Sequence, residues 1–447
     1  MEYQAVSRLL PGLSFFWDAA ASESSFRRLI LNESLAEAAT FHGQFAHAWT
    51  AEGCAFAARD PYGIQKLFYA INPTSRSIHF GHSVLEVMRD AACGFGQVYS
   101  IPAGCFGKFD LRLGTHLVRP YHFLPDHASF STSTNLERTA HAVREKLEKC
   151  LRGFLSRLKA KEVYVTLSGG LDSTLVAALL KDQAARLGIK VVAFTFSLTG
   201  CPNASSTEPS DDLLYARRVA EDLGMPIKEV VVSTANVVAA VDEALRAGMD
   251  WRDFNHHCAL ANIFLARAIS AHAPAAPGGE LPVVFTGELM NELTADYTTV
   301  CLDGAEYYPV PKISKKRLQR LYLQGMDSTS RETGIFQAYG IQVLEIYFCV
   351  SEDYLAIPEQ VLAEPTAKQT ISQLAASDLV PDYIFKRKKV REQVGSESGG
   401  GILGTMIQSG ITQDTLKRRF VDSFSLPSQL PVEGIFQLGR YRHQAKI

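Results

Sequence analysis

The chain has neither a strong charge imbalance nor a long apolar run. Its 45 basic residues nearly balance its 47 acidic residues, so overall charge gives no reason to expect a nucleic acid or a membrane surface as partner. No uninterrupted apolar stretch reaches the length that spans a bilayer. The first residues, Met-Glu-Tyr-Gln-Ala-Val, lack the basic and apolar segments of a signal peptide. We therefore expect a cytoplasmic protein that acts on small molecules.

Cysteine pairs of the Cys-x-x-Cys type are also absent among the eight cysteines, so the common zinc and thiol-redox motifs are excluded. Scattered thiols of this kind suit a reducing compartment, where they pack as small apolar side chains. His256, His257 and Cys258 are consecutive, and consecutive residues of a helix point in different directions. We interpret these three as packing residues rather than metal ligands.

A third absence is the Gly-x-x-x-x-Gly-Lys-[Ser/Thr] phosphate loop. The chain has instead a six-residue string between an apolar strand and an apolar helix. The glycines leave the main chain open to a polyanion, and the turn amides and the helix dipole point at one place. The serines add hydroxyl donors, and the aspartate is suited to hold the Mg²⁺ of a nucleotide. A bare Gly-Gly turn is common, but the full string favours a nucleotide site: Ser168, Gly169, Gly170, Leu171, Asp172 and Ser173.

The patterns of strands and helices divide the chain into two domains. Short apolar runs at residues 44–49, 54–58, 67–71 and 78–81 predict a strand-rich domain over residues 1–125. A polar, Ser- and Thr-rich linker is expected at residues 126–136. Residues 137–447 then alternate between helices and apolar strands, the strands falling at residues 163–167, 191–196, 228–232 and 282–286. This alternation predicts an α/β fold with a parallel sheet that binds ligands beyond the carboxyl ends of its strands. From residue 315 to residue 385 the chain reads as helical.

These features make the chain resemble the class B asparagine synthetases and the β-lactam and carbapenam synthetases over nearly its full length. The string at residues 168–173 is similar to the PP-loop of the ATP-pyrophosphatases, which split ATP between its α and β phosphates. Residues 41–48, 58–69 and 101–104 resemble the family's amidotransferase half. The resemblance implies an antiparallel αββα sandwich of the N-terminal-nucleophile type, followed by an adenine-nucleotide α-hydrolase-like synthetase domain with a helical C-terminal part.

The first half departs from the family at its nucleophile. The family's glutaminase needs a cysteine as the first residue of the mature chain, where the free α-amine acts as base. Here Met1 is followed by Glu2 and Tyr3, and the first cysteine is Cys54. We therefore predict that the first domain is structural and releases no ammonia from glutamine. The β-lactam and carbapenam synthetases are similar in lacking this cysteine.

In the second half, residues 286–297 resemble the family's Gly-Glu-Gly-x-Asp-Glu-Leu-x-x-Gly-Tyr segment. The resemblance puts Gly287 at the nucleotide. Glu288 falls where the asparagine synthetases place a glutamate beside the incoming amine, and it is the predicted base. Asn291 replaces a Mg²⁺-binding aspartate, so the metal is held more weakly or passes to Glu292. The alternative is that these carboxylates are solvated loop residues.

Residues 385–395 resemble the family's Arg-x-Lys segment, in which a glycine follows the lysine six residues later. That spacing selects Arg387 and Lys389, with Lys388 as a near competitor. A lysine here stabilises the charge that builds up on the oxyanion and on the departing pyrophosphate. The alternative is a solvated basic face. The resemblance also places the adenine over the turn after residues 194–197, which names Phe194 and Ser197.

The predicted function is a Mg²⁺- and ATP-dependent ligase that adenylates a small-molecule carboxylic acid and joins it to an amine, releasing AMP and pyrophosphate, in specialised-metabolite (antibiotic-type) biosynthesis. One alternative is an intramolecular lactam- or peptide-ring-forming synthetase. A second alternative is an inactive nucleotide-binding partner protein. The sequence leaves a homodimer open.

Overall fold

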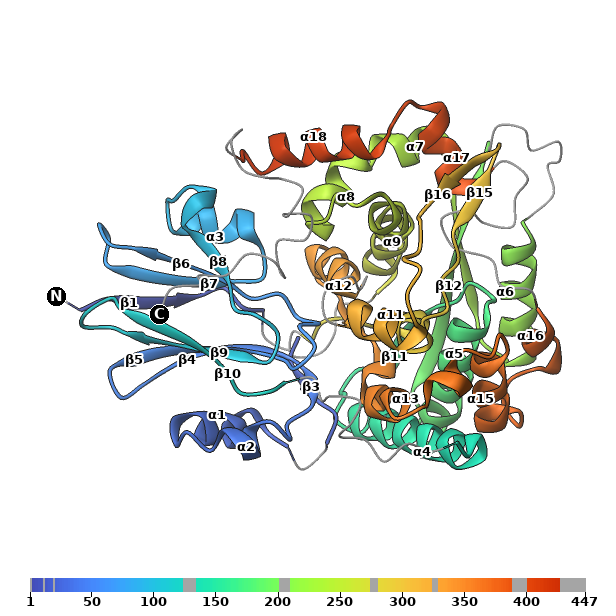
Figure 1. The fold of residues 1–447 in the computed structure, drawn as a ribbon, viewed down its shortest axis with the longest axis horizontal. Coiled ribbons are helices and arrows are strands. Elements are labelled where there is room, and N and C mark those ends of the chain that lie inside the picture. Colours follow the sequence, from blue (N-terminus) through green and yellow to red (C-terminus); the bar gives the residue numbers. More distant parts are fainter. Residues whose placement is uncertain are drawn as a thin grey trace.

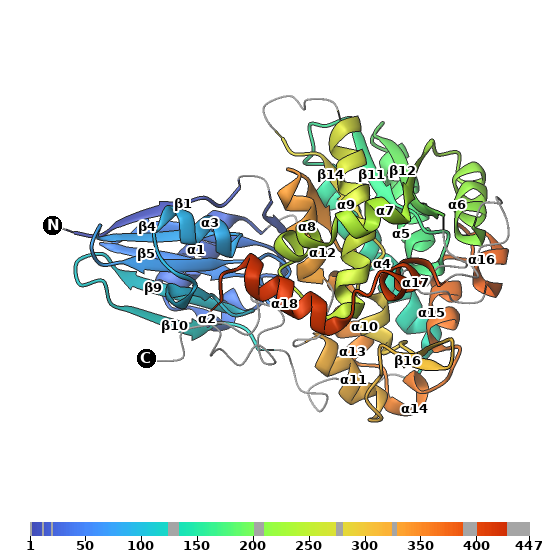
Figure 2. The same ribbon diagram turned by 90° about the horizontal axis from the view of Figure 1, so that it is seen from above.

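The computed structural model describes residues 2–10, 13–18, 21–123, 134–200, 210–273, 280–323, 329–387 and 400–426. It contains a smaller strand-rich part at the N-terminal end and a larger part beside it (Figures 1 and 2). Most of the expected linker lies outside the described residues. None of the helices in these ranges has the length and apolar character needed to cross a bilayer.

The smaller part stacks two four-stranded sheets with helices on both outer faces (Figure 1). The first sheet has the order β1 (Gln4–Ser7), β7 (Ser77–Gly81), β6 (Phe68–Asn72), β8 (Val98–Ser100). The second has the order β10 (His116–Pro120), β9 (Cys105–Asp110), β5 (Cys54–Arg59), β4 (Ala46–Ala51). Helix α3 (Val84–Asp90) covers the first sheet, and α1 (Glu23–Leu31) and α2 (Leu35–Ala38) cover the second. The expected αββα sandwich is confirmed, but β1 pairs with β7 in parallel, so the first sheet is mixed.

Alternation of side chains along the strands builds the core of this sandwich. In β5, Ala55 and Ala57 face the other sheet and pack with Phe80 and Phe109. The intervening Phe56 faces the opposite way, into the core beneath α1. One strand therefore serves two apolar layers, which explains why its sequence reads as a continuous apolar run.

The larger part is built on a five-stranded sheet in which all neighbouring strands are parallel. Its order is β13 (Ile227–Ser233), β12 (Lys190–Thr199), β11 (Glu162–Thr166), β14 (Val283–Phe285), β17 (Gln342–Leu344). Helices α4 (Leu136–Leu155) and α5 (Leu171–Ala185) pack on one face, with Val163 and Val165. Helices α8 (Val241–Gly248), α9 (Asp253–His272) and α12 (Thr329–Ala338) pack on the other, with Tyr164. The predicted parallel sheet with helices on both faces is confirmed. The expectation of an all-helical segment after residue 315 is wrong at β17, which has only three residues and shows no periodicity.

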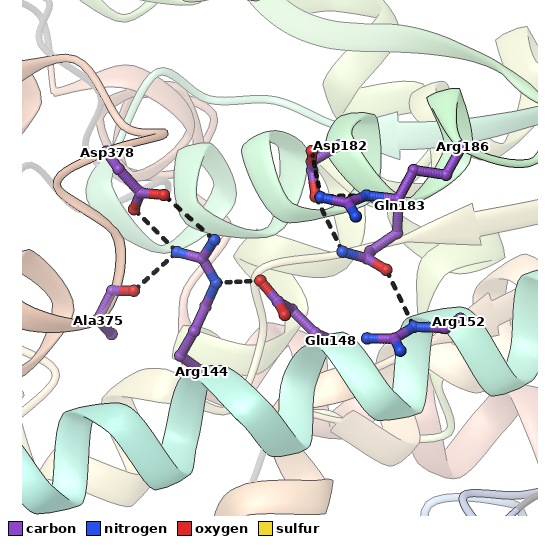
Figure 3. Close-up of polar contacts among 8 residues, drawn as sticks. All are labelled: Arg144, Glu148, Arg152, Asp182, Gln183, Arg186, Ala375 and Asp378. Carbon is purple, nitrogen blue, oxygen red and sulfur yellow. Dashed lines mark hydrogen bonds and ion pairs between the residues drawn. The ribbon is translucent and has the colours of Figure 1, made fainter.

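Polar contacts tie α4 to the two helices that carry the candidate site (Figure 3). Arg144 donates to the carbonyl of Ala375 at 2.9 Å, at the end of α15 (Ala367–Ala376), and to Asp378 at 3.0 Å. Arg152 donates to Gln183 of α5 at 3.4 Å. Helix α4 therefore fixes α15 and α5 relative to each other.

Buried polar contacts also join the two parts of the molecule. The side chain of Gln44 donates to the carbonyl of Val343 in β17 at 3.1 Å and accepts from the amide of Glu345 at 2.9 Å. The ammonium of Lys66 donates to the carbonyl of Gly248 at 2.8 Å. Because β17 is an edge strand, the Gln44 carboxamide supplies hydrogen bonds that a further strand would otherwise make.

Candidate active site

The loop between β11 and α5 contains Gly169 and Gly170, which have different structural roles. Gly169 has φ +70°, and a Cβ there would lie 2.7 Å from the amide nitrogen of Ala216 in α6 (Asp211–Asp222). Gly169 is therefore required by backbone conformation and by helix packing. At Gly170 a Cβ would meet only Ser168 Oγ, at 3.3 Å. Gly170 is the glycine that leaves the main chain open to a ligand.

Hydrogen bonds between Ser168 and Ser173 stabilise this loop. Ser173 Oγ accepts from the amide of Ser168 at 3.2 Å and lies 3.0 Å from Ser168 Oγ. Gly170 is the N-cap residue of α5, and no side chain caps the helix. The first amides of a helix have no carbonyl partner within the helix, so they are available to an anion. The loop thus presents backbone amides that no described side chain caps, at the residues for which the sequence predicts a phosphate site, and that assignment stays a prediction.

The loop opens into a cavity of about 270 Å³ at the carboxyl edge of the sheet. Neither Gly169 nor Glu292 lines this cavity, and Lys388 and Lys389 lie outside the described residues. The other residues predicted for the site do line it: Ser168, Gly170, Leu171, Asp172, Ser173, Phe194, Ser197, Gly287, Glu288, Asn291 and Arg387.

Lys368 is a site residue that the sequence analysis missed. Its ammonium lies 2.5 Å from Asp172 Oδ2, 2.8 Å from Asn291 Oδ1 and 3.8 Å from Asp296 Oδ2. Its side chain is only 6% exposed. It comes from α15, in a stretch where nothing but helical character is visible in the sequence. A fixed cation therefore lies at the head of α5.

The residues fit a Mg²⁺ ion only in part. Asp172 Oδ1 is buried and has no hydrogen-bond partner among the described residues, so it is suited to bind a cation. The Asn291 oxygen accepts from Lys368, and Glu292 is buried and accepts from the Tyr297 hydroxyl at 2.5 Å. The described part of the chain holds no group of three or more His, Cys, Asp or Glu side chains placed to bind a metal. Of the predicted ligands, Asp172 lines the cavity and has an oxygen suited to a cation, whereas Glu292 does not line the cavity.

The segment after β14 is held tightly against the phosphate loop. A Cβ at Gly287 would lie 2.7 Å from the amide nitrogen of Ser173, so only glycine permits this approach. The buried Leu289 has φ +82° at the start of α10 (Met290–Thr294). Glu288 Oε1 lies 3.4 Å from the fully buried guanidinium of Arg331. Glu288 is therefore a held carboxylate on the cavity wall, and the solvated-loop alternative is wrong for it.

Arg387 lies against the phosphate loop rather than on a solvated face. It donates to the carbonyl of Ser168 at 3.4 Å and pairs with Asp212. Its guanidinium also stacks 4.1 Å from the centre of the Tyr215 ring. The side chain is thereby fixed beside the loop at residues 168–173.

Helix α9 presents one face to the cavity through Asn255, Cys258, Asn262 and Leu265, spaced by three, four and three residues. His256 and His257 point elsewhere, toward the Val241 carbonyl at 3.0 Å and the Tyr308 hydroxyl at 2.6 Å. Burial lowers the pKa of His256 to about 4 and that of His257 to about 3. The packing interpretation is confirmed for the histidines, whereas Cys258 faces the cavity.

Comparison with known proteins adds a family match to this geometry. Residues 142–328 match the family model for asparagine synthase. The matched segment includes the phosphate loop, the face of α9 and the segment that follows β14.

Two similar relatives are the glutamine-hydrolysing asparagine synthetases of Gallus gallus, 25% identical over 363 residues, and of Homo sapiens, 24% identical over 366 residues. Each alignment covers 76% of this chain and 61% of the relative. The chain thus spans about three fifths (61%) of the length of the curated relatives that it matches. Among solved structures, an NMN synthetase from Francisella tularensis is 12% identical with a TM-score of 0.29, covering 66% of this chain and 94% of that one.

Proposed function

We propose, starting from the asparagine synthase domain at residues 142–328, that the chain is an ATP-dependent carbon–nitrogen ligase that forms AMP and pyrophosphate. One observation carries this proposal. The uncapped head of α5, the ammonium of Lys368 and the guanidinium of Arg387 converge on one cavity. Three sources of positive potential at one place favour a polyphosphate.

The proposed reaction has two steps. A carboxylate oxygen of the acid attacks the α-phosphorus of ATP, the bond to the bridging oxygen breaks, and pyrophosphate leaves. An amine then attacks the carbonyl carbon of the acyl-adenylate, a C–N bond forms, and AMP leaves with the electrons of the C–O bond. The amine's proton passes to a carboxylate, and we propose Glu288 for this role because it lines the cavity and pairs with Arg331. Mg²⁺ held by Asp172 would neutralise phosphate charge when bound.

The basic residues of the site would act on the phosphates. Arg387 and Lys368 would stabilise the charge of the departing pyrophosphate, since both are fixed before the nucleotide binds. Lys389 keeps its proposed role on the oxyanion. The nucleotide base is proposed to lie near Phe194 and Ser197, on the wall formed by β12.

We propose further that the sandwich part supplies no ammonia. Burial raises the pKa of the Cys105 thiol to about 11 and raises that of Cys93 as well. Thiols with raised pKa are poor nucleophiles, because the thiolate is the reactive form. Cys54 begins β5 at the turn from β4. The amine would therefore come from free ammonia, from a second substrate or from the acid-bearing molecule itself, as expected for specialised metabolism.

The test is a nucleotide assay on the full chain. α,β-Methylene-ATP should bind by calorimetry, and ATP with aspartate or a panel of other carboxylic acids plus ammonium or hydroxylamine should yield AMP and pyrophosphate. Asp172→Ala should abolish both products. Formation of ADP, or a failure to bind the analogue, would refute the proposal. The mass of the product then distinguishes the routes: loss of water from one molecule indicates a ring, and a combined mass indicates two substrates.

A further inference from the structure

One wall of the cavity is lined by hydrogen-bond acceptors. Asn255 and Asn262 both line the cavity, and they are only 1% and 3% exposed. Both amide nitrogens already have a carboxylate partner, Asp250 at 2.6 Å for Asn255 and Glu332 at 2.7 Å for Asn262. Since each nitrogen is held by a carboxylate, a flipped amide would set two oxygens against each other. The orientation of both side chains is therefore fixed.

With the amide nitrogens occupied in this way, the two amide oxygens lack hydrogen-bond donors in the described part of the chain. Neither Asn255 Oδ1 nor Asn262 Oδ1 has a hydrogen-bond partner among the residues that the structure describes. A buried acceptor without a donor is costly, and native proteins seldom retain one unless a water, an ion or a ligand satisfies it. Two such oxygens along the same helix face indicate that a donor is missing from this wall.

Two carboxylates complete the wall. Glu332 is 2% exposed, lines the cavity, and accepts from Asn262 and from the Thr286 hydroxyl at 2.9 Å. Glu288 lies two residues beyond Thr286 and is held by Arg331, the neighbour of Glu332 in the chain. We call the four residues Asn255, Asn262, Glu288 and Glu332 the acceptor wall. All four side chains present hydrogen-bond acceptors, namely two amide oxygens and two carboxylates, and the oxygens of Asn255 and Asn262 are those without a partner among the described residues.

The acceptor wall lies next to the phosphate loop. Gly287, directly before Glu288, approaches the amide of Ser173 so closely that no side chain fits between them. A nucleophile bound on the wall would therefore be near the substrate carboxylate that reacts at the α-phosphorus. Attack on an acyl-adenylate requires this proximity.

We propose that the acceptor wall is the subsite of the nucleophile and that it selects a primary amine, which binds as its ammonium. This inference rests on the proposed ligase function. A primary ammonium offers three N–H donors and one positive charge to a wall of two amide oxygens and two carboxylates. An alcohol of the same size offers one donor and no charge, so it leaves acceptors unsatisfied. The site therefore favours amide over ester formation and selects against tertiary amines, whose ammonium form offers a single N–H donor to the wall.

The probe is methylammonium, with methanol as its uncharged counterpart of similar size. Saturation-transfer NMR on the full chain without nucleotide should detect methylammonium and not methanol. Glu332→Gln, which keeps the shape and removes the charge, should weaken methylammonium binding about tenfold or more, as expected for loss of a charged hydrogen bond. Asn262→Leu should weaken it as well, with folding of both variants checked by circular dichroism.

Asp172→Asn is the matched control, since it removes a carboxylate of the same cavity outside the acceptor wall. It should impair nucleotide binding and leave methylammonium binding unchanged. Equal binding of methylammonium and methanol by the wild-type chain would overturn the inference even if no variant folds, and so would a Glu332→Gln chain that binds like wild type. Methylammonium binding without any binding of α,β-methylene-ATP would instead refute the ligase function and leave the subsite standing.

Discussion

The ammonium of Lys368 and the carboxylate of Asp172 form a buried ion pair at 2.5 Å, directly at the head of α5. Lys368→Met leaves Asp172 without its cation, and removing one partner of a buried pair typically costs about 3 kcal/mol of stability. We expect a loss of that size in urea unfolding, together with weaker binding of α,β-methylene-ATP.

The exposed pair of Lys190 with Glu162, at 2.7 Å, provides the matched control, because the Lys190 side chain is 58% exposed. Lys190→Met should change the free energy of unfolding by less than about 1 kcal/mol, as surface ion pairs do. Equal losses in the two variants would show that the Lys368 pair is not buried in solution.

The two glycines of the phosphate loop should respond differently to alanine. Gly169→Ala forces a side chain into φ +70° and against the backbone of α6 at 2.7 Å, so we expect a loss of about 2 kcal/mol or more in stability. Gly170→Ala meets only Ser168 Oγ, so stability should change by no more than about 1 kcal/mol while nucleotide affinity falls. Chemical unfolding and calorimetry measure the two effects. A Gly170→Ala chain that binds nucleotide normally would argue against a phosphate at this loop.

The Gln44 carboxamide should be essential to the contact between the two parts of the molecule. Gln44→Ala removes both side-chain bonds to β17 and leaves the Val343 carbonyl and the Glu345 amide without them. The expected cost is about 2–4 kcal/mol, since each buried group left unsatisfied costs roughly 1–3 kcal/mol. Thermal unfolding checks this, with the exposed Gln408→Ala of α17 (Gly401–Gln408) as control. A melting temperature like that of wild type would show that the contact is not maintained.

The sequence was sufficient to predict those elements whose signal lies within a short stretch of the chain. The apolar runs of β5, β11 and β12 and the string at residues 168–173 identify strands and loop, because each signal is complete within a few residues. Residues that join the site from elsewhere were not visible. Lys368 is one lysine in a helical stretch, and nothing nearby in the sequence marks it as a site residue. Asn262 can be recognised as a site residue only in the fold, where α9 faces the cavity and its amide contacts Glu332. Lys389 is outside the described residues and stays a prediction.

Acid should destabilise the fold through its buried histidines. His256 is fully buried, and burial lowers its pKa from 6.5 to about 4. Between these values the unfolded chain binds a proton that the folded chain does not, so stability falls as pH drops from 6.5 toward 4. At pH 5 this single residue should account for about 2 kcal/mol, at about 1.4 kcal/mol per pKa unit. Asp60 opposes the trend, because burial raises its pKa to about 6.

Comparing the pH dependence of stability in wild type and in a His256 variant separates the effect of His256 from that of Asp60, because Asp60 is present in both chains. His256→Gln retains an amide N–H for the Val241 carbonyl, to which His256 Nε2 lies at 3.0 Å, and has no group that titrates. The variant should therefore gain about 2 kcal/mol relative to wild type when urea unfolding at pH 7 is repeated at pH 5. Leu245→Ala, in the same buried cluster as the neighbouring helix α9, should lose stability equally at both pH values. If the curves of His256→Gln and wild type ran parallel, His256 would be protonated in the fold, and its burial would be less complete than the structure indicates.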